Sequence, residues 1–91
     1  MNYKVEFAHY DDELTLPDGW VDTSWHNDAC PSFEKNIKGT TYRVWCDFKD
    51  PSLSEVGGLR FAVNKYLEQE DEYLPMGEFN TLQEALDSIN N

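Results

Sequence analysis

Apolar and polar residues alternate along several stretches of the chain, as they do in strands that bury one face. This alternation predicts a first strand over residues 3–8 and a second over residues 32–37. Lys38 and Gly39 follow as a hairpin turn, in which the glycine supplies a positive φ. Residues 40–48 are rich in β-branched and aromatic side chains and predict a third strand, the clearest in the chain.

The strand over residues 40–48 has two unlike faces, because successive side chains point to opposite sides of a strand. One face carries Tyr42, Val44, Cys46 and Phe48, and the other carries Thr41, Arg43, Trp45 and Asp47. We assign the first face to the core. Trp45 then lies on the opposite face, where it is either exposed or covered by an ordered loop that we expect over residues 20–31.

Two further strands follow in the second half of the chain. Residues 59–67 predict one strand, and the acidic residues 68–72 predict a solvated turn after it. Residues 73–79 predict the last strand. Pro75 places that strand at the edge of the sheet, because proline cannot donate a hydrogen bond to a neighbouring strand.

Thr81 and Glu84 form a capping box, in which each side chain bonds the backbone amide of the other residue at a helix start. One face of the helix that follows carries Leu82, Ala85, Leu86 and Ile89. So short a helix is marginal by itself and must dock on the sheet. We therefore expect residues 1–91 to form a single α+β domain, with an antiparallel sheet of four to five strands and one C-terminal α-helix packed on one face.

Charge is unevenly distributed along the 91 residues. The net charge is −11, and residues 66–91 hold seven acidic side chains and no basic one. Residues 1–28 hold seven acidic side chains and a single basic one, Lys4. Nucleic acids and anionic membranes require a cationic surface, so this charge argues against direct binding to either. It permits a basic protein partner or a metal ion, and the alternative is that the charge only keeps a small domain in solution.

Cys30 and Cys46 allow at most one disulfide, fewer than a small secreted scaffold usually carries. The first residues have neither the basic segment nor the apolar stretch of a signal peptide. No apolar run approaches the ~20 residues that span a bilayer. We therefore expect a cytoplasmic protein with free thiols.

Three residues with reactive or metal-binding side chains, His26, Asp28 and Cys30, lie close together in one loop. A cysteine with a histidine is the pairing of a nucleophile and its base. Together with His9 and Cys46, these residues also have the donor types of a zinc site. However, the chain contains no Cys-x-x-Cys pair and no recognisable oxyanion donors. We therefore expect no enzymatic activity, no catalytic residue, no bound metal and no cofactor.

Acidic and aromatic side chains are the candidates for contact with a partner. Glu68, Glu70 and Glu72 alternate along a stretch that, if extended, would space them like the phosphates of a nucleic-acid strand. The alternative is a mobile acidic turn. Tryptophan is enriched at the hot spots of protein interfaces. The expected partner-binding residues are Glu68, Glu70, Asp71, Glu72, Trp25 and Trp45.

The run of residues 19–33, GWVDTSWHNDACPSF, resembles a pattern of small uncharacterised phage and prophage proteins. Residues 44–48 (VWCDF), residues 59–63 (LRFAV) and the capped C-terminal helix are similar to the same group. The resemblance carries no activity and no residue role. It implies a bacterial host cell and a counter-defence role, such as an anti-CRISPR protein or a DNA mimic that occupies the nucleic-acid channel of a CRISPR complex, restriction enzyme or polymerase.

Three functional hypotheses follow from these patterns. The leading one is a small acidic, inhibitor-like domain that binds a basic, nucleic-acid-handling protein in the cytoplasm of a bacterial host. The first alternative is a small-ligand or metal-binding domain built on the loop from Trp20 to Phe33. The second alternative is a structural domain whose charge confers only solubility.

Overall fold

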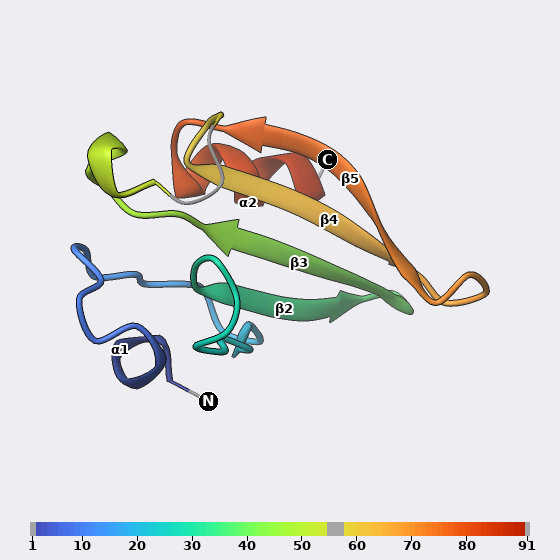
Figure 1. Ribbon diagram of the computed structural model, residues 1–91. Helices are drawn as coiled ribbons and strands as arrows, with labels where there is room; N and C mark the ends of the chain where they lie inside the picture. Colours follow the sequence, from blue (N-terminus) through green and yellow to red (C-terminus); the bar gives the residue numbers. More distant parts are fainter. Residues whose placement is uncertain (1, 55–57, 91) are drawn as a thin grey trace.

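The computed structural model describes residues 2–54 and 58–90 (Figure 1). Its elements are α1 (Tyr3–Glu6), β1 (Val21–Asp22), β2 (Ser32–Ile37), β3 (Thr40–Cys46), the 3₁₀ helix η1 (Pro51–Leu53), β4 (Phe61–Leu67), β5 (Glu72–Phe79) and α2 (Leu82–Asn90). Within the described residues, five strands form one antiparallel sheet in the order β1-β2-β3-β4-β5. The C-terminal helix α2 packs against strands β3, β4 and β5 of this sheet. The predicted α+β fold is confirmed.

The predicted hairpin joins β2 to β3. Lys38 and Gly39 both have positive φ, 53° and 86°, as the two central residues of a type I′ turn require. The side chain of Asn36 accepts a hydrogen bond from the amide of Gly39 at 3.1 Å and closes the turn. This turn sets the register that places Trp45 opposite Ser32.

The core lies on one face of the sheet, between the sheet, α2 and the N-terminal segment, which contributes Tyr3. It is formed mainly by Val44 and Cys46 of β3, Phe61 and Val63 of β4, and Ala85 and Leu86 of α2. All six side chains are buried, and the alternation along β3 and β4 selected these four strand residues correctly. Burying each large aliphatic or aromatic side chain contributes roughly 1.5–3 kcal/mol.

Helix α2 begins with the predicted capping box. The amide of Glu84 donates to the Thr81 hydroxyl at 3.1 Å, and the Glu84 carboxylate accepts from the amide of Thr81 at 3.2 Å. Leu82 and Ile89 pack against the core beside the fully buried residues. The apolar face of the helix is therefore the face that the sequence pattern predicted.

The first strand expected, over residues 3–8, is not formed. The segment starts instead with one turn of helix, Tyr3–Glu6, which the side chain of Asn2 caps by accepting an amide hydrogen bond at 2.9 Å. Alternation would bury every second residue, yet Val5 is 72% exposed while Tyr3 is 8% exposed. The burial of Tyr3 and the cap by Asn2 therefore determine the conformation of this segment, and its alternating pattern does not.

Strand β3 ends at Cys46, two residues earlier than predicted. The amide of Asp47 still donates to the Arg60 carbonyl at 2.9 Å, and its carboxylate accepts hydrogen bonds from the Phe48 amide at 2.8 Å and the Ser54 hydroxyl at 2.6 Å. Asp47, which the alternation places on the outer face with Trp45, is therefore buried by its own contacts and is only 2% exposed. β4 likewise begins at Phe61 rather than at residue 59.

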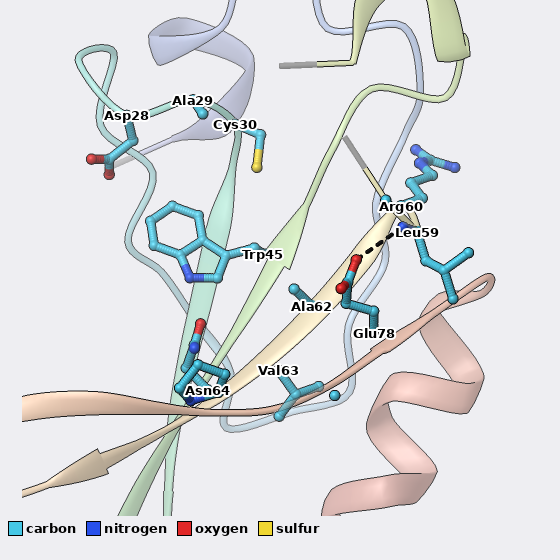
Figure 2. A pocket seen from close by; sticks show the side chains of 13 residues that line it. Asp28, Ala29, Cys30, Trp45, Leu59, Arg60, Ala62, Val63, Asn64 and Glu78 are labelled. Carbon is cyan, nitrogen blue, oxygen red and sulfur yellow. Dashed lines mark hydrogen bonds between the residues drawn. The ribbon is translucent and has the colours of Figure 1, made fainter. Parts of the chain in front are cut away.

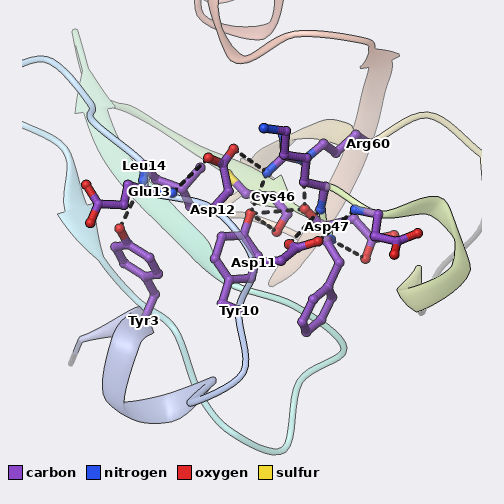
Figure 3. A network of polar contacts seen from close by, with 12 residues as sticks. Tyr3, Tyr10, Asp11, Asp12, Glu13, Leu14, Cys46, Asp47 and Arg60 are labelled. Carbon is purple, nitrogen blue, oxygen red and sulfur yellow. Dashed lines mark hydrogen bonds and ion pairs between the residues drawn. The ribbon is translucent and has the colours of Figure 1, made fainter.

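A polar network ties the N-terminal segment to the start of β4 (Figure 3). The Tyr10 hydroxyl lies 3.1 Å from the carbonyl oxygen of Cys46 and 3.0 Å from that of Asp47. The Arg60 guanidinium donates to the Tyr10 hydroxyl at 3.1 Å and to Asp12 at 2.9 Å. Charged hydrogen bonds thus hold a segment without regular secondary structure against the sheet. In the part of the chain that the structure describes, no helix has the length and apolar character needed to cross a membrane.

Candidate functional site: a cleft on the open face of the sheet

The face of the sheet turned away from α2, which we call the open face, is rich in aromatic and charged side chains. Pairing along the strands brings Glu34 beside Arg43, Trp45 beside Ala62, Ala62 beside Glu78, and Tyr66 beside Tyr73. The open face thus lacks the continuous apolar surface that α2 covers on the other side. Trp45 lies on it as predicted, and its side chain is half-buried.

A cleft of about 570 Å³ hollows the open face (Figure 2). Ala62 of β4 lies between Trp45 of β3 and Glu78 of β5 in the strand register. The small alanine side chain leaves space between its larger neighbours. Asn64, two residues further along β4, borders the same space. The cleft therefore lies where two small residues, Ala62 of β4 and Gly77 of β5, interrupt the larger side chains of the sheet.

The loop before β2 forms one rim of the cleft, through residues 28–30. The Thr23 amide donates to the Ser32 carbonyl at 2.9 Å, and the Ser32 amide donates to the hydroxyl of the buried Ser24 at 3.2 Å. The Pro31 carbonyl accepts from the amide of Cys46 at 2.9 Å. These bonds hold the loop beside Trp45, so Trp45 is neither fully exposed nor fully covered.

Two carboxylates border the cleft without a basic partner among the described residues. The carboxylate of Glu78 accepts a hydrogen bond from the Leu59 amide at 2.9 Å, and Asp28 makes no side-chain hydrogen bond within the described ranges. Arg60 also lines the cleft, but its guanidinium is bonded to Asp12, which lies outside it. The rim therefore carries negative charge that the described residues do not neutralise.

Beside the cleft, the open face carries an arginine held between two aromatic rings. The carbon at the centre of the Arg43 guanidinium lies 4.3 Å from the ring centroid of Tyr73 and 5.1 Å from that of Trp45. Arg43 forms an ion pair with Glu34, which also accepts from the Tyr73 hydroxyl at 2.9 Å. Burial, and then the bond to Glu34, raise the pKa of Tyr73. This part of the face already satisfies its own charges.

The predicted acidic turn joins β4 to β5. The amide of Glu70 donates to the Leu67 carbonyl at 3.1 Å, and Asp71 has a positive φ of 50°. The chain therefore reverses here, and the alternative of an extended row of Glu68, Glu70 and Glu72 with phosphate-like spacing was wrong. Asp71 accepts from the Tyr66 hydroxyl at 2.5 Å, whereas the three glutamates are exposed and make no ion pair with any described residue.

Trp25 does not belong to the cleft. Its ring is 42% exposed and lies 4.2 Å, centroid to centroid, from the ring of His26. His26 Nδ1 lies 3.0 Å from the carboxylate of Glu6, and this contact lowers the pKa of Glu6. Of the two tryptophans proposed as partner-binding residues, Trp45 lines the cleft and Trp25 does not.

The structure does not bring His26, Asp28 and Cys30 together as a catalytic or metal-binding group. His26 faces Glu6, while Cys30 is 1% exposed and burial raises the pKa of its thiol to about 12. A nucleophilic cysteine needs the opposite shift. Cys46 is fully buried, and burial raises its pKa as well. Over residues 2–54 and 58–90, no three His, Cys, Asp or Glu side chains gather to hold a metal ion.

Three cleft residues, Ala62, Asn64 and Glu78, were not predicted as site residues. Their positions depend on the β-bulge between Val63 and Asn64, where the pairing with β5 shifts by one residue. An alanine among larger residues in a strand can indicate a hollow in the sheet. The residues on the adjacent strands that border the hollow can be named only when the strand register is known.

We compared the chain with protein-family models, with curated proteins and with solved structures, and none of the three comparisons found a significant match. The likeness of residues 19–33 to phage proteins therefore remains a hypothesis. The function has to be inferred from the cleft and from the charge around it.

Proposed function

We propose that this chain is a non-enzymatic binding domain that docks the open face of its sheet on a basic protein. One observation carries the proposal, the cleft beside Trp45 with its two carboxylates, Asp28 and Glu78. An exposed aromatic-lined hollow on a small domain is the kind of feature that marks a binding surface. Because the carboxylates have no basic partner among the described residues, a cationic partner complements the site.

The charge of the whole chain supports the same class of partner. The net charge of −11 produces a field that accelerates the approach of a basic protein and repels nucleic acid. Glu68, Glu70 and Asp71 belong to the turn between β4 and β5, which extends from one end of the sheet (Figure 1), and Glu72 begins β5. In the proposed complex these acidic residues steer the encounter and Trp45 anchors it.

Proteins that handle nucleic acids present cationic surfaces, since binding phosphates requires them. An acidic domain on such a surface excludes the nucleic acid and so acts as an inhibitor. In a bacterial host this function takes the form of counter-defence, in which the domain blocks the nucleic-acid channel of a CRISPR complex, restriction enzyme or polymerase.

Recovery of partners from a bacterial lysate tests the proposal, with the tagged chain compared with two double variants. Glu68→Gln/Glu70→Gln neutralises the turn, and Asp18→Asn/Asp87→Asn changes the net charge equally without touching the turn or the cleft. We expect the native chain to retain a nucleic-acid-binding protein that added DNA releases. The turn variant should retain less of that protein than its matched control, and its binding should depend less on salt.

Two results would contradict the proposal. One is recovery of no specific protein at low or moderate salt. The other is a recovered protein that DNA does not displace and that binds the native chain and both double variants equally. In either case the charge of the chain serves solubility rather than recognition.

The volume of the cleft supports a second candidate, the binding of a small apolar ligand. About 570 Å³ lies within the roughly 300–1,000 Å³ typical of ligand pockets, and the loop from Trp20 to Phe33 supplies part of the rim. Native mass spectrometry of the chain purified from its host tests this candidate. A bound mass that Trp45→Leu abolishes and Asp87→Asn leaves unchanged supports it, and an unliganded mass counts against it.

A further inference from the structure

We infer that the cleft beside Trp45 receives an arginine side chain of the protein partner. This inference rests on the proposed function, and it specifies which chemical group of the basic partner is recognised. The cleft brings the ring of Trp45, the carboxylate of Glu78 and the side-chain amide of Asn64 to one hollow of the open face, and Asp28 lies at its rim with its carboxylate directed away from Trp45 (Figure 2).

Trp45 supplies the aromatic surface. Tryptophan is the side chain whose ring attracts cations most strongly, and the attraction grows when water is excluded. Its indole N–H donates to no described residue, and the ring borders the cleft while remaining half-buried. A flat cation that enters the hollow above Ala62 therefore meets the indole of Trp45.

Asp28 and Glu78 supply the charge. Both line the cleft, and neither has an ion pair with a described lysine or arginine. Among the described residues that line the cleft, the only basic side chain is that of Arg60, whose guanidinium is directed to Asp12 at 2.9 Å. A cation is therefore the group that the cleft lacks, and it would restore charge balance there.

Asn64 adds a further acceptor. Its side-chain amide makes no hydrogen bond to the described residues, and it borders the cleft next to Trp45 (Figure 2). A guanidinium presents five N–H donors in one plane, which suits several acceptors around an aromatic face better than the point charge of an ammonium. The arrangement of acceptors thus favours arginine over lysine.

The open face itself already holds an arginine in this way. The Arg43 guanidinium lies 4.3 Å from the Tyr73 ring and pairs with the carboxylate of Glu34. The cleft offers a ring in Trp45 and carboxylates in Asp28 and Glu78, although the guanidinium carbon of Arg43 also lies 5.1 Å from the Trp45 ring centroid. A partner arginine would therefore use the part of the ring that borders the cleft, and would repeat an arrangement that the chain uses internally.

Titration of the ¹⁵N-labelled chain with three capped tripeptides, followed by NMR, tests the inference. The probes are acetyl-Gly-Xaa-Gly-amide with arginine, lysine or citrulline at the centre, because citrulline has nearly the shape of arginine but no charge. We expect the arginine peptide to shift the Trp45 indole resonance and the amide resonances of Ala29 and Asn64 saturably. The lysine peptide should bind about two- to fivefold more weakly, and the citrulline peptide about tenfold or more.

Two variants of equal charge separate the cleft from the general acidity of the chain. Asp28→Asn should weaken binding of the arginine peptide about two- to fivefold. Asp87→Asn, which removes the same charge from the outer side of α2, should leave that binding unchanged. Trp45→Leu removes the ring and should weaken binding further, and its amide spectrum reports whether the fold is retained.

Three outcomes overturn the inference. They are equal binding of the citrulline and arginine peptides, shifts confined to the acidic turn at residues 68–72, and equal effects of Asp28→Asn and Asp87→Asn. None of these results decides whether the chain binds a basic protein, because recovery of a DNA-displaceable partner is measured separately. A DNA-displaceable partner that binds through the turn, with no arginine binding in the cleft, would support the binding of a basic protein but refute both this inference and the cleft as the docking site.

Discussion

The guanidinium of Arg60 donates a hydrogen bond to the hydroxyl of Tyr10, which precedes it by fifty residues, across 3.1 Å. The same hydroxyl lies 3.0 Å from the Asp47 carbonyl oxygen, so it accepts from the arginine and donates to the backbone. Burial raises the pKa of Tyr10, which keeps the hydroxyl protonated for this double role. The N-terminal segment is thus attached to the sheet by a neutral phenol between a cation and a carbonyl.

Replacing Tyr10 with phenylalanine should therefore destabilise the domain. Tyr10→Phe removes an acceptor from a charged donor and a donor from two carbonyls while retaining the ring that packs on Tyr3. We expect a loss of about 1–2 kcal/mol in the free energy of unfolding, measured by urea denaturation.

Tyr66→Phe is the matched control, because it deletes a hydroxyl that bonds Asp71 in an exposed turn. Its effect should stay within about 0.5 kcal/mol. If Tyr10→Phe is as harmless as this control, the network in Figure 3 does not contribute to stability.

The fold could be predicted from the sequence wherever a local signal coincided with tertiary packing. Lys38-Gly39 carries its own turn geometry and Thr81 carries its own cap, so neither depends on distant residues. The alternation in β3 and β4 is likewise reinforced by α2. Tyr3 shows the limit, because a short alternating run has the same pattern whether or not a neighbouring strand is available to pair with it.

The cleft could be predicted only in part. Trp45 was correctly placed on the face opposite the core, because alternation alone determines the face. Ala62 and Glu78 could not be recognised as its neighbours, since the β-bulge after Val63 changes the pairing with β5. Register depends on contacts between strands, and a sequence pattern within one strand does not contain it.

Acid should weaken the attachment of the N-terminal segment through Asp12. Its hydrogen bond to Arg60 lowers the pKa of this carboxyl in the folded state. Because the pKa of the Asp12 carboxyl is lower in the folded than in the unfolded state, its ionised form stabilises the fold above the unfolded pKa, about 3.9. This stabilisation is lost as the pH falls through the folded pKa. Native stability should therefore decline below about pH 5.

The Asp12→Asn variant should be about 1 kcal/mol less stable than the native chain at pH 7. Its stability should decline less in acid, as urea midpoints from pH 7 to pH 2 would show. Parallel pH profiles for the two proteins would exclude this role.

Removal of the helix cap should loosen α2. Thr81→Ala leaves the amide of Glu84 without its hydroxyl acceptor and should lower the free energy of unfolding by about 1 kcal/mol. Thr15→Ala changes an exposed threonine whose side chain makes no hydrogen bond to the described residues. It should change stability by less than about 0.5 kcal/mol. Equal denaturation midpoints for the two variants would show that the cap does not stabilise the domain.

Both cysteines should be unreactive while the chain is folded. Cys30 is 1% exposed and Cys46 is fully buried, and burial raises the pKa of both thiols. The thiolate is the reactive form, so modification requires unfolding or local opening. At pH 8, Ellman's reagent should modify the native thiols at least about a hundredfold more slowly than thiols in urea-unfolded protein. Rapid modification of one equivalent in native protein would reveal an accessible thiolate and reopen a nucleophilic role for Cys30.

Substitution of Gly58 should disturb the cleft through Glu78. Gly58 has a φ of +72°, and a Cβ built on it would lie 2.3 Å from the Glu78 carboxylate oxygen that accepts from the Leu59 amide. Gly39 also has a positive φ, +86°, but an added Cβ would meet nothing within 4 Å. Gly58→Ala and Gly39→Ala therefore share the backbone cost of about 1 kcal/mol, and only the first displaces a cleft carboxylate.

NMR should show a shifted Leu59 amide resonance and weaker binding of the arginine peptide in Gly58→Ala alone. If Gly39→Ala weakens peptide binding equally, general loosening of the sheet is responsible and Glu78 does not position the ligand.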